Sequence, residues 1–259
     1  MKSILNMRQN EERKELISML EKEEMSPLSI TDGKVLINGM TRYFLTRIGK
    51  APYFRISAVP IKTGRNIVNV DQKQIKELFQ NPPNQRWSGW NMESFYSSVE
   101  RFPEGIFRGD KKDRMLILQQ NGHMEFYAPL DQNFCWRQSE EEFKKQPRLY
   151  PYPVVEYPFS FLDLYKHIIK TSNIESSLII SMQYLNCKGY TLLPYKPESM
   201  GFIFPRKTVK SFDKEHLIIP ELDIDHDYNP HLVCYDLLKY FYAVFSYTPD
   251  MIPFFVEDK

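Results

Sequence analysis

The stretch MLILQQNGHMEFY, residues 115–127, decides the fold because it has the pattern of a β-hairpin. Two runs rich in apolar residues flank Asn121 and Gly122, the dipeptide best suited to a two-residue type I′ turn. With that turn, Gln120 would face His123 across the two strands. The stretch therefore predicts two neighbouring strands of an antiparallel sheet.

The two faces of this hairpin differ in character. In the predicted register one face holds Leu116, Leu118, Gln120, His123, Glu125 and Tyr127, and the other holds Met115, Ile117, Gln119, Met124, Phe126 and Ala128. His123 and Glu125 share a face because side chains two residues apart on a strand point the same way. A general acid–base pair has this geometry, and so has the solvated face of a sheet or a structural hydrogen-bond pair. We treat the two residues as candidate catalytic groups with a structural alternative.

The composition is that of a soluble globular protein. The chain of 259 residues is 42% hydrophobic and 26% charged, enough for a real core in one large domain or two small ones. A net charge of +1 produces no overall field toward nucleic acid or an anionic membrane. The three cysteines form no C-x₂-C motif, which favours a reducing compartment over a disulfide framework or a zinc module.

The N-terminal segment predicts a cytoplasmic protein with a partner. Residues 1–24 lack the apolar core of a signal peptide, and no apolar run of the chain is long enough to span a membrane. Residues 8–24 are charged and contain neither Gly nor Pro, which predicts an exposed amphipathic helix. We expect its apolar face to contact a protein partner or a separately encoded effector domain through Leu16, Ile17 and Leu20.

The following part of the chain predicts a β-rich unit. Residues 27–61 are strand-like and are broken by Asp-Gly and Asn-Gly pairs, and residues 53–61 alternate well enough for a central strand. Asp71 is placed to cap a short helix that runs through Phe79. The further strands that we expect are residues 104–110 and 133–137.

The last part of the chain mixes helices with strands. A charged helix from residue 138 leads into a Pro-rich connection that ends at residue 153, the best candidate for a subdomain boundary. Asn229 as N-cap and Pro230 at the first helical position predict a helix start. Helices are expected at 159–173 and 229–246, and strands at 176–193 and 216–225.

Together these elements predict an α+β fold. We expect an antiparallel or mixed sheet with helices packed on one side, preceded by the exposed N-terminal helix. The predicted organisation is an interaction helix at 1–26, a β-rich subdomain at 27–147, and an α/β subdomain at 148–259 that packs with it as one unit.

An acidic cluster, PELDIDHDYNPH at 220–231, suggests metal chemistry. On a strand Glu221, Asp223 and Asp225 share one face, and three carboxylates can hold Mg²⁺ or Mn²⁺. The alternative is an ordinary solvated face, because Leu222 and Ile224 occupy the opposite side. No P-loop, G-x-G-x-x-G motif or serine elbow is present, so we expect no cofactor and no motif supports an enzyme class.

Basic and aromatic residues interleave in three places, which suits single-stranded nucleic acid. Lys and Arg contact phosphates, and Trp stacks on bases. The residues are Arg86, Trp87 and Trp90 in NQRWSGWN, Lys111, Lys112 and Arg114 in RGDKKDRM, and Arg206, Lys207 and Lys210 in FPRKTVKSF. The alternative is structural, since neighbouring Asp residues dilute the second group and loop Trp residues often cover a core edge.

Several segments, taken in order, resemble prokaryotic Schlafen-type proteins. The N-terminal helix resembles the helix that leaves the nucleic-acid-binding AlbA-like domain of that family, and FRISAVPI resembles its strand that ends in Pro. RWSGWNMESF is similar to a family loop, and MLILQQNGHMEFY to the hairpin v-q-l-f-r-n-G-x-i-E. SSLIISMQYLNCKGYTLL resembles v-S-L-l-g-v-k-G-y-x-l, and YDLLKYFYAVFS resembles f-D-x-l-W-n-a-x-G, without its Trp and Gly.

The resemblance implies an accessory region downstream of the AlbA-like domain, in bacterial proteins linked to DNA binding, transcription or defence. That domain lies outside these 259 residues, so no catalytic or DNA-contacting residue is carried over. The matching family positions are Gly122, Glu125, Gly189 and Asp236, which a turn, a hydrogen bond at a sheet edge and a helix contact explain.

The leading hypothesis is thus a non-enzymatic accessory, sensor or interaction module of a Schlafen-like protein. The alternatives are a metal-dependent nuclease or hydrolase that uses the acidic cluster, and a direct binder of single-stranded nucleic acid.

Overall fold

The computed structural model describes residues 31–86, 89–92, 98–109, 114–136, 138–193, 195–196, 201–202 and 210–254. The predicted helix at 8–24, with Leu16, Ile17 and Leu20, lies outside these residues.

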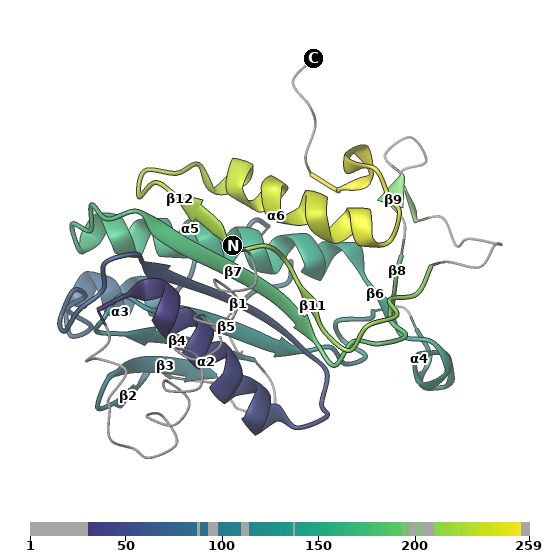
Figure 1. The fold of residues 1–259 in the computed structure, drawn as a ribbon, viewed down its shortest axis with the longest axis horizontal. Helices are drawn as coiled ribbons and strands as arrows, with labels where there is room; N and C mark the ends of the chain where they lie inside the picture. Colours follow the sequence, from purple (N-terminus) through teal and green to yellow (C-terminus); the bar gives the residue numbers. More distant parts are fainter. Residues whose placement is uncertain are drawn as a thin grey trace, which may run out of the picture.

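One antiparallel sheet of eight strands organises the molecule (Figure 1). Its strand order is β11-β7-β1-β5-β4-β3-β2, and β12 pairs with β7 beside β11. The strands are β1 Tyr53–Pro60, β2 Glu100–Phe102, β3 Gly105–Gly109, β4 Met115–Gln119, β5 Met124–Pro129, β7 Leu178–Leu185, β11 Leu217–Ile218 and β12 Leu222–Ile224. β1 lies between β5 and β7, so the predicted central strand is confirmed.

Helices cover both faces of the sheet. The long helices α5 (Pro151–Thr171) and α6 (Pro230–Val244) pack on one face, and α2 (Gly33–Ile48) crosses the other (Figure 1). The α+β class and the antiparallel sheet are confirmed, and α2 adds a helix on the second face. The smaller elements are α3 Lys73–Gln80, α4 Glu140–Lys145, η3 Pro249–Met251, the parallel pair β6 Arg148–Leu149 with β8 Thr191–Leu192, and the pair β9 Tyr195–Lys196 with β10 Gly201–Phe202.

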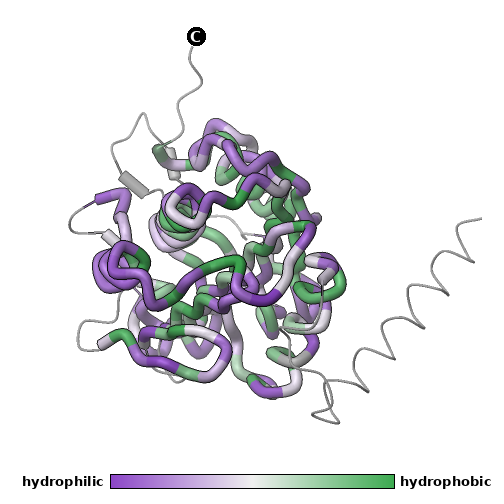
Figure 2. The backbone as a smooth tube through the Cα atoms, turned by 90° about the vertical axis from the view of Figure 1, so that its left-hand side faces the viewer, coloured by the Kyte–Doolittle hydropathy of each residue, from purple (hydrophilic) through white to green (hydrophobic). Residues whose placement is uncertain are grey.

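The main core fills the space between the sheet and α5 and α6. Phe54 and Tyr184, from neighbouring strands, are fully buried there with their ring centres 5.1 Å apart, and Phe241 of α6 packs on Tyr184 at 4.5 Å. Figure 2 shows hydrophobic segments inside and hydrophilic segments toward the outside. Because β1 pairs with β7, strands from both sides of residue 147 share this sheet and this core. No described helix is both long and apolar enough to cross a bilayer.

The helix α2 replaces strands that the sequence predicts, so this prediction is wrong. Asp32 ends the preceding segment as an N-cap, and its Oδ1 accepts hydrogen bonds from the amides of Lys34 and Val35 at 2.9 and 3.0 Å. Gly33 is required because a Cβ there would lie 2.1 Å from the Pro60 carbonyl oxygen. The Asp-Gly pair is therefore a helix start packed against the end of β1, rather than a turn between strands.

The hairpin exists as predicted, but its register is shifted by one residue. The Gly122 amide donates to the Gln119 carbonyl at 3.0 Å, and the Gln119 amide donates to the His123 carbonyl at 2.9 Å. Residues 120–122 thus form a three-residue loop, with Gly122 at a φ of 83°. This is the arrangement of a type I turn followed by a left-handed residue, in place of the two-residue type I′ turn.

The shifted register separates the apolar and polar side chains of the hairpin onto opposite faces more completely than the predicted register. Leu118 pairs with Met124 and Leu116 with Phe126, so one face is wholly apolar and joins the main core. Ile117 is the residue opposite Glu125. Because a one-residue slip exchanges the faces of a strand, burial of the apolar residues selects this register.

Three local predictions also need correction. The N-cap of α3 is Gln72, and Asp71 pairs instead with Lys76 and Arg101. Residues 133–136 form a turn rather than a strand, because the carboxylate of Asp131 binds backbone amides that a strand would pair.

The Pro-rich stretch begins a helix rather than a connection, since Pro151 stands at the start of α5, where its missing N–H has no cost. The predicted start of α6 is confirmed, with Asn229 accepting the His231 amide at 2.9 Å.

Candidate functional site

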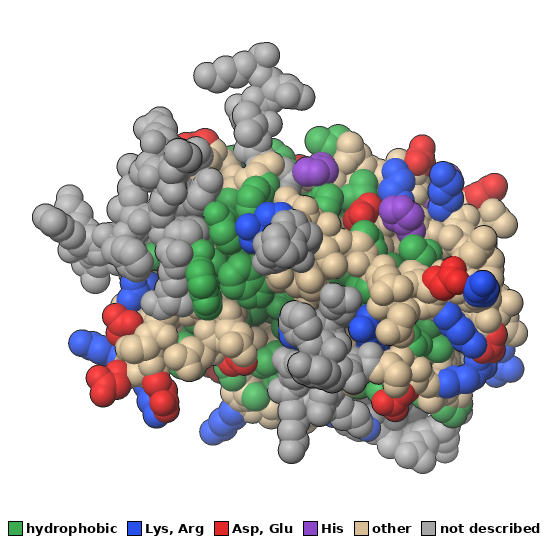
Figure 3. All heavy atoms as spheres, turned by 180° about the vertical axis from the view of Figure 1, so that it is seen from behind, with side chains coloured by type: hydrophobic (Ala, Val, Ile, Leu, Met, Phe, Trp, Pro, Cys, Tyr) green, Lys and Arg blue, Asp and Glu red, His purple; other side chains and the backbone are tan. Residues whose placement is uncertain are grey.

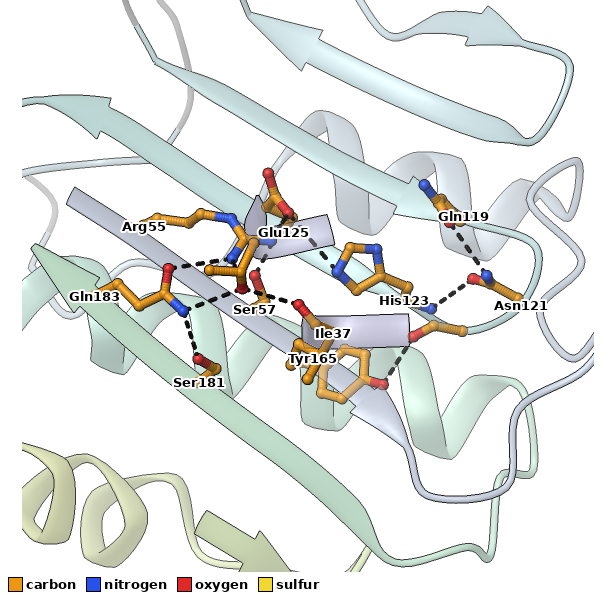
Figure 4. A network of polar contacts seen from close by, with 12 residues as sticks. Ile37, Arg55, Ser57, Gln119, Asn121, His123, Glu125, Tyr165, Ser181 and Gln183 are labelled. Carbon is orange, nitrogen blue, oxygen red and sulfur yellow. Dashed lines mark hydrogen bonds and ion pairs between the residues drawn. The ribbon is translucent and has the colours of Figure 1, made fainter. Parts of the chain in front are cut away.

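A buried polar layer lies between the sheet and α2, and it contains the predicted His123–Glu125 pair. Glu125 stands on β5, His123 immediately precedes that strand, and both side chains point to the face that α2 covers (Figure 4). Their exposed fractions are only 1% for His123 and 3% for Glu125. The pair therefore lies on a face of the sheet that a helix covers, and not on a solvent-exposed face.

An ion pair at the centre of the layer joins Glu125 to Arg55 of β1, which is fully buried. Arg55 Nη1 also donates to Thr41 Oγ1 of α2 at 2.7 Å and lies 3.3 Å from Gln183 Oε1. Gln183 Nε2 in turn donates to Ser181 Oγ at 3.0 Å. These contacts tie α2 to three strands, so the layer fixes how the helix sits on the sheet.

His123 stands at the edge of this layer. Neither of its ring nitrogens has a hydrogen-bond partner among the described residues, and Nε2 lies 3.8 Å from Glu125 Oε2. Burial lowers the pKa of His123 to about 4, opposed by the charge of Glu125 and assisted by that of Arg55. A general acid or base must reach its substrate, and this neutral, enclosed imidazole does not reach the surface. The geometry therefore favours a structural role for these two candidate residues over a catalytic one.

The acidic candidates for a metal site lie at the edge of the sheet. Asp223 on β12 and Asp225 beyond it are exposed, and Asp225 pairs with His226 at 2.7 Å. Glu221 is half-buried, with its carboxylate 4.0 Å from Lys34 Nζ. In the part of the chain that the structure describes, no three His, Cys, Asp or Glu side chains are arranged to hold a metal ion. The solvated-face interpretation fits these residues.

The structure separates the candidates for nucleic-acid binding. Arg86, Trp90 and Arg114 come together at one site, whereas Lys210 is exposed elsewhere and contacts Ser246 Oγ at 3.4 Å. The residues outside the described part are Trp87, Lys111, Lys112, Arg206 and Lys207.

Arg86, Gly89 and Trp90 lie around one buried carboxylate, an arrangement here called the clamp. Glu156 on α5 is 1% exposed, and its Oε1 lies 2.7 Å from Arg86 Nε and 2.5 Å from Arg86 Nη2. Its Oε2 accepts the Trp90 amide at 2.5 Å. A Cβ at Gly89 would lie 2.2 Å from that same oxygen. Burial raises the pKa of Glu156, while the Trp90 amide and the Arg86 charge oppose the rise.

Aromatic rings surround this clamp. The Trp90 ring packs against Tyr150 at 5.3 Å and Trp136 at 5.8 Å between centroids, which fixes its orientation. The Arg86 guanidinium lies over the ring of Tyr152 at 4.6 Å. Trp136 is 45% exposed. The face in Figure 3 shows hydrophobic side chains gathered beside a basic one.

A pocket of about 220 Å³ opens next to Trp90. It combines aromatic walls with one basic and one acidic side chain, and is lined by Trp90, Arg114, Ala128, Pro129, Asp131, Asn133, Phe134 and Tyr157. Nη1 of Arg114 donates to the Asn91 carbonyl at 2.9 Å and lies 3.4 Å from the Tyr157 hydroxyl. The walls are therefore held in place by the loop on one side and by α5 on the other.

The pocket next to Trp90 is open to a ligand, whereas the side chains of the polar layer under α2 are buried. Aromatic walls with a few fixed polar groups are the usual make-up of a ligand site. Sequence reasoning missed Glu156, Asp131 and Tyr157. A signal for Glu156 was present, because it is the single charge in the otherwise apolar run PYPVVEYPFSFL.

Comparison with known proteins adds no relative. The chain matches no protein-family model, no curated protein and no solved structure. The resemblance to Schlafen-type proteins stays a prediction.

Proposed function

We propose that this chain is a non-enzymatic binding module whose pocket, here called the Trp90 pocket, holds a planar, negatively charged group of a ligand. The observation that carries the proposal is the pocket itself, whose lining combines Trp90, Phe134 and Tyr157 with Arg114 in one small space. The buried pair of His123 and Glu125 leaves binding, rather than acid–base catalysis, as the function that the geometry favours.

The pocket's walls are organised before any ligand arrives. Glu156 holds the loop through Arg86 and the Trp90 amide, and Trp90 is backed by other rings. A site that is already ordered loses little conformational entropy on binding, which favours affinity. This arrangement suits a sensor or interaction module, which we place in the cytoplasm as part of a Schlafen-type protein.

The experiment is a titration with 2-naphthoate, a planar aromatic carboxylate, followed by quenching of tryptophan fluorescence. We expect saturable binding that Arg114→Gln weakens about tenfold, since a hydrogen bond to a charged group contributes about 1.5–3 kcal/mol. Asn133→Trp should block binding, because Asn133 is exposed at the pocket and its backbone contact to Asp131 is kept.

The matched control is Lys210→Gln, which removes one exposed positive charge away from the pocket lining. It should leave the affinity for 2-naphthoate unchanged. If naphthoate fails to bind, or binds equally well to the Asn133→Trp variant, the proposal is wrong.

A further inference from the structure

We infer that the ligand of the Trp90 pocket is a nucleotide, whose base lies against Trp90 and whose phosphate lies beside Arg114. The inference rests on the proposed function and specifies the chemistry of its ligand. Three features of the pocket carry it: its size, its fixed positive charge and its acidic edge.

The size fits one planar ring system. Pockets for drug-sized ligands measure about 300–1,000 Å³, and this one measures about 220 Å³. Every nucleobase offers a π-face to aromatic side chains, and such stacking contributes about 1–3 kcal/mol for each base. Trp90 is partly exposed and offers such a face, whereas Phe134 and Tyr157, only 2% and 3% exposed, line the same small space from the core side.

The positive charge has a fixed position. The contacts of Arg114 Nη1 with the Asn91 carbonyl and the Tyr157 hydroxyl join the guanidinium to two walls of the pocket. Arginine recognises phosphate well because its planar donors match the geometry of the phosphate oxygens. An anionic substituent on the base-bearing sugar is therefore favoured on this side.

The acidic edge selects among bases. Asp131 Oδ1 accepts the amides of Asn133 and Phe134 at 2.9 and 3.1 Å, and Oδ2 accepts from Asn133 Nδ2 at 3.3 Å, so the carboxylate is held in one orientation. A carboxylate has about four acceptor sites, and these three contacts leave capacity for another donor. Carboxylates accept hydrogen bonds from exocyclic amino groups of bases. Adenine and cytosine should therefore bind better than uracil.

The test compares AMP, adenosine and UMP by calorimetry on the whole chain. We expect AMP to bind about tenfold more tightly than adenosine and more tightly than UMP. Arg114→Gln should remove the advantage of AMP over adenosine, and Lys210→Gln should keep it. Asp131→Asn, which retains an acceptor for the turn, should reduce the preference for AMP over UMP.

The outcomes separate this inference from the proposed function. If 2-naphthoate binds but AMP does not bind at millimolar concentration, the assignment of a nucleotide as the ligand is wrong, and the proposal of a binding pocket is kept. If neither binds, both are wrong. If Arg114→Gln leaves the ratio of AMP to adenosine affinity unchanged, the assignment of the phosphate is overturned.

A second arm identifies the source of the nucleotide. Binding of an oligomer of ten deoxyadenylates at least tenfold more tightly than AMP, with strong salt dependence, identifies a single strand as the ligand. Binding of AMP as tightly as the oligomer identifies a free nucleotide. Either result supports the nucleotide chemistry.

Discussion

Acid should destabilise the fold through His123, and the structure gives the size of the effect. The pKa of this imidazole falls from 6.5 to about 4 because burial penalises its charged form. Between about pH 4 and pH 6.5, His123 is therefore mostly protonated in the unfolded chain and mostly neutral in the folded chain. Stability is therefore fully present above about pH 6.5 and is lost as the pH falls toward 4.

The full displacement of the His123 pKa corresponds to about 3.5 kcal/mol, because each pKa unit is about 1.4 kcal/mol. At pH 5, where the folded His123 is still mostly neutral, about 2 kcal/mol of this has been lost relative to pH 7. The neighbouring charges act in opposite directions, with Glu125 raising and Arg55 lowering the His123 pKa. Burial is the largest cause, so the direction of the change is set by the enclosure under α2.

The assay is urea-induced unfolding followed by circular dichroism at pH 7 and pH 5. Because other groups also titrate in this range, His123→Leu serves as the control, since it removes the imidazole and leaves no hydrogen bond unmade among the described residues. The wild-type protein should lose about 2 kcal/mol more than this variant between the two pH values. Equal losses would refute the claim that His123 is buried and neutral.

Three further perturbations test the Glu156 clamp, the buried ion pair and the predicted N-terminal helix. Gly89→Ala places a Cβ 2.2 Å from Glu156 Oε2 and should lower both stability, in urea unfolding, and naphthoate binding, whereas an unaffected titration would contradict the clamp. Glu125→Ala should cost about 3–5 kcal/mol in urea unfolding because it leaves Arg55 buried without its ion pair, and a loss below about 1 kcal/mol would contradict that pairing. If the helix that the sequence predicts at 8–24 is an interface, association should disappear, by light scattering, when Glu replaces Leu16, Ile17 and Leu20.

The hairpin shows how far the sequence alone could go. Asn121 and Gly122 correctly locate the turn, yet the dipeptide fits both a two-residue loop and a three-residue loop that ends in Gly. The choice between them depends on burial across the strands, where Leu118 must face Met124 for both to join the core. That contact belongs to the folded sheet, so the turn signal alone did not determine the register.

The sequence did not predict the helix α2 or the Trp90 pocket, for different physical reasons. Residues 33–48 contain β-branched side chains between Gly-containing pairs, which favour strands locally, but the Asp32 cap and burial of Leu36 and Ile37 beside β1 favour a helix. The pocket joins a loop, the ends of two strands and α5, which lie far apart in sequence. The sequence indicates Arg86 and Trp90 as candidates, whereas their contacts with Glu156 follow only from the tertiary structure.

The most direct test of the central claim is an NMR titration of the tryptophan indole N–H groups with 2-naphthoate. The chain contains three tryptophans, so each resonance can be assigned by single Trp→Phe variants. We predict that the Trp90 resonance shifts saturably with naphthoate, and that Asn133→Trp abolishes this shift. A Trp90 resonance that stays in place while naphthoate binds elsewhere would contradict the assignment of this pocket as the binding site.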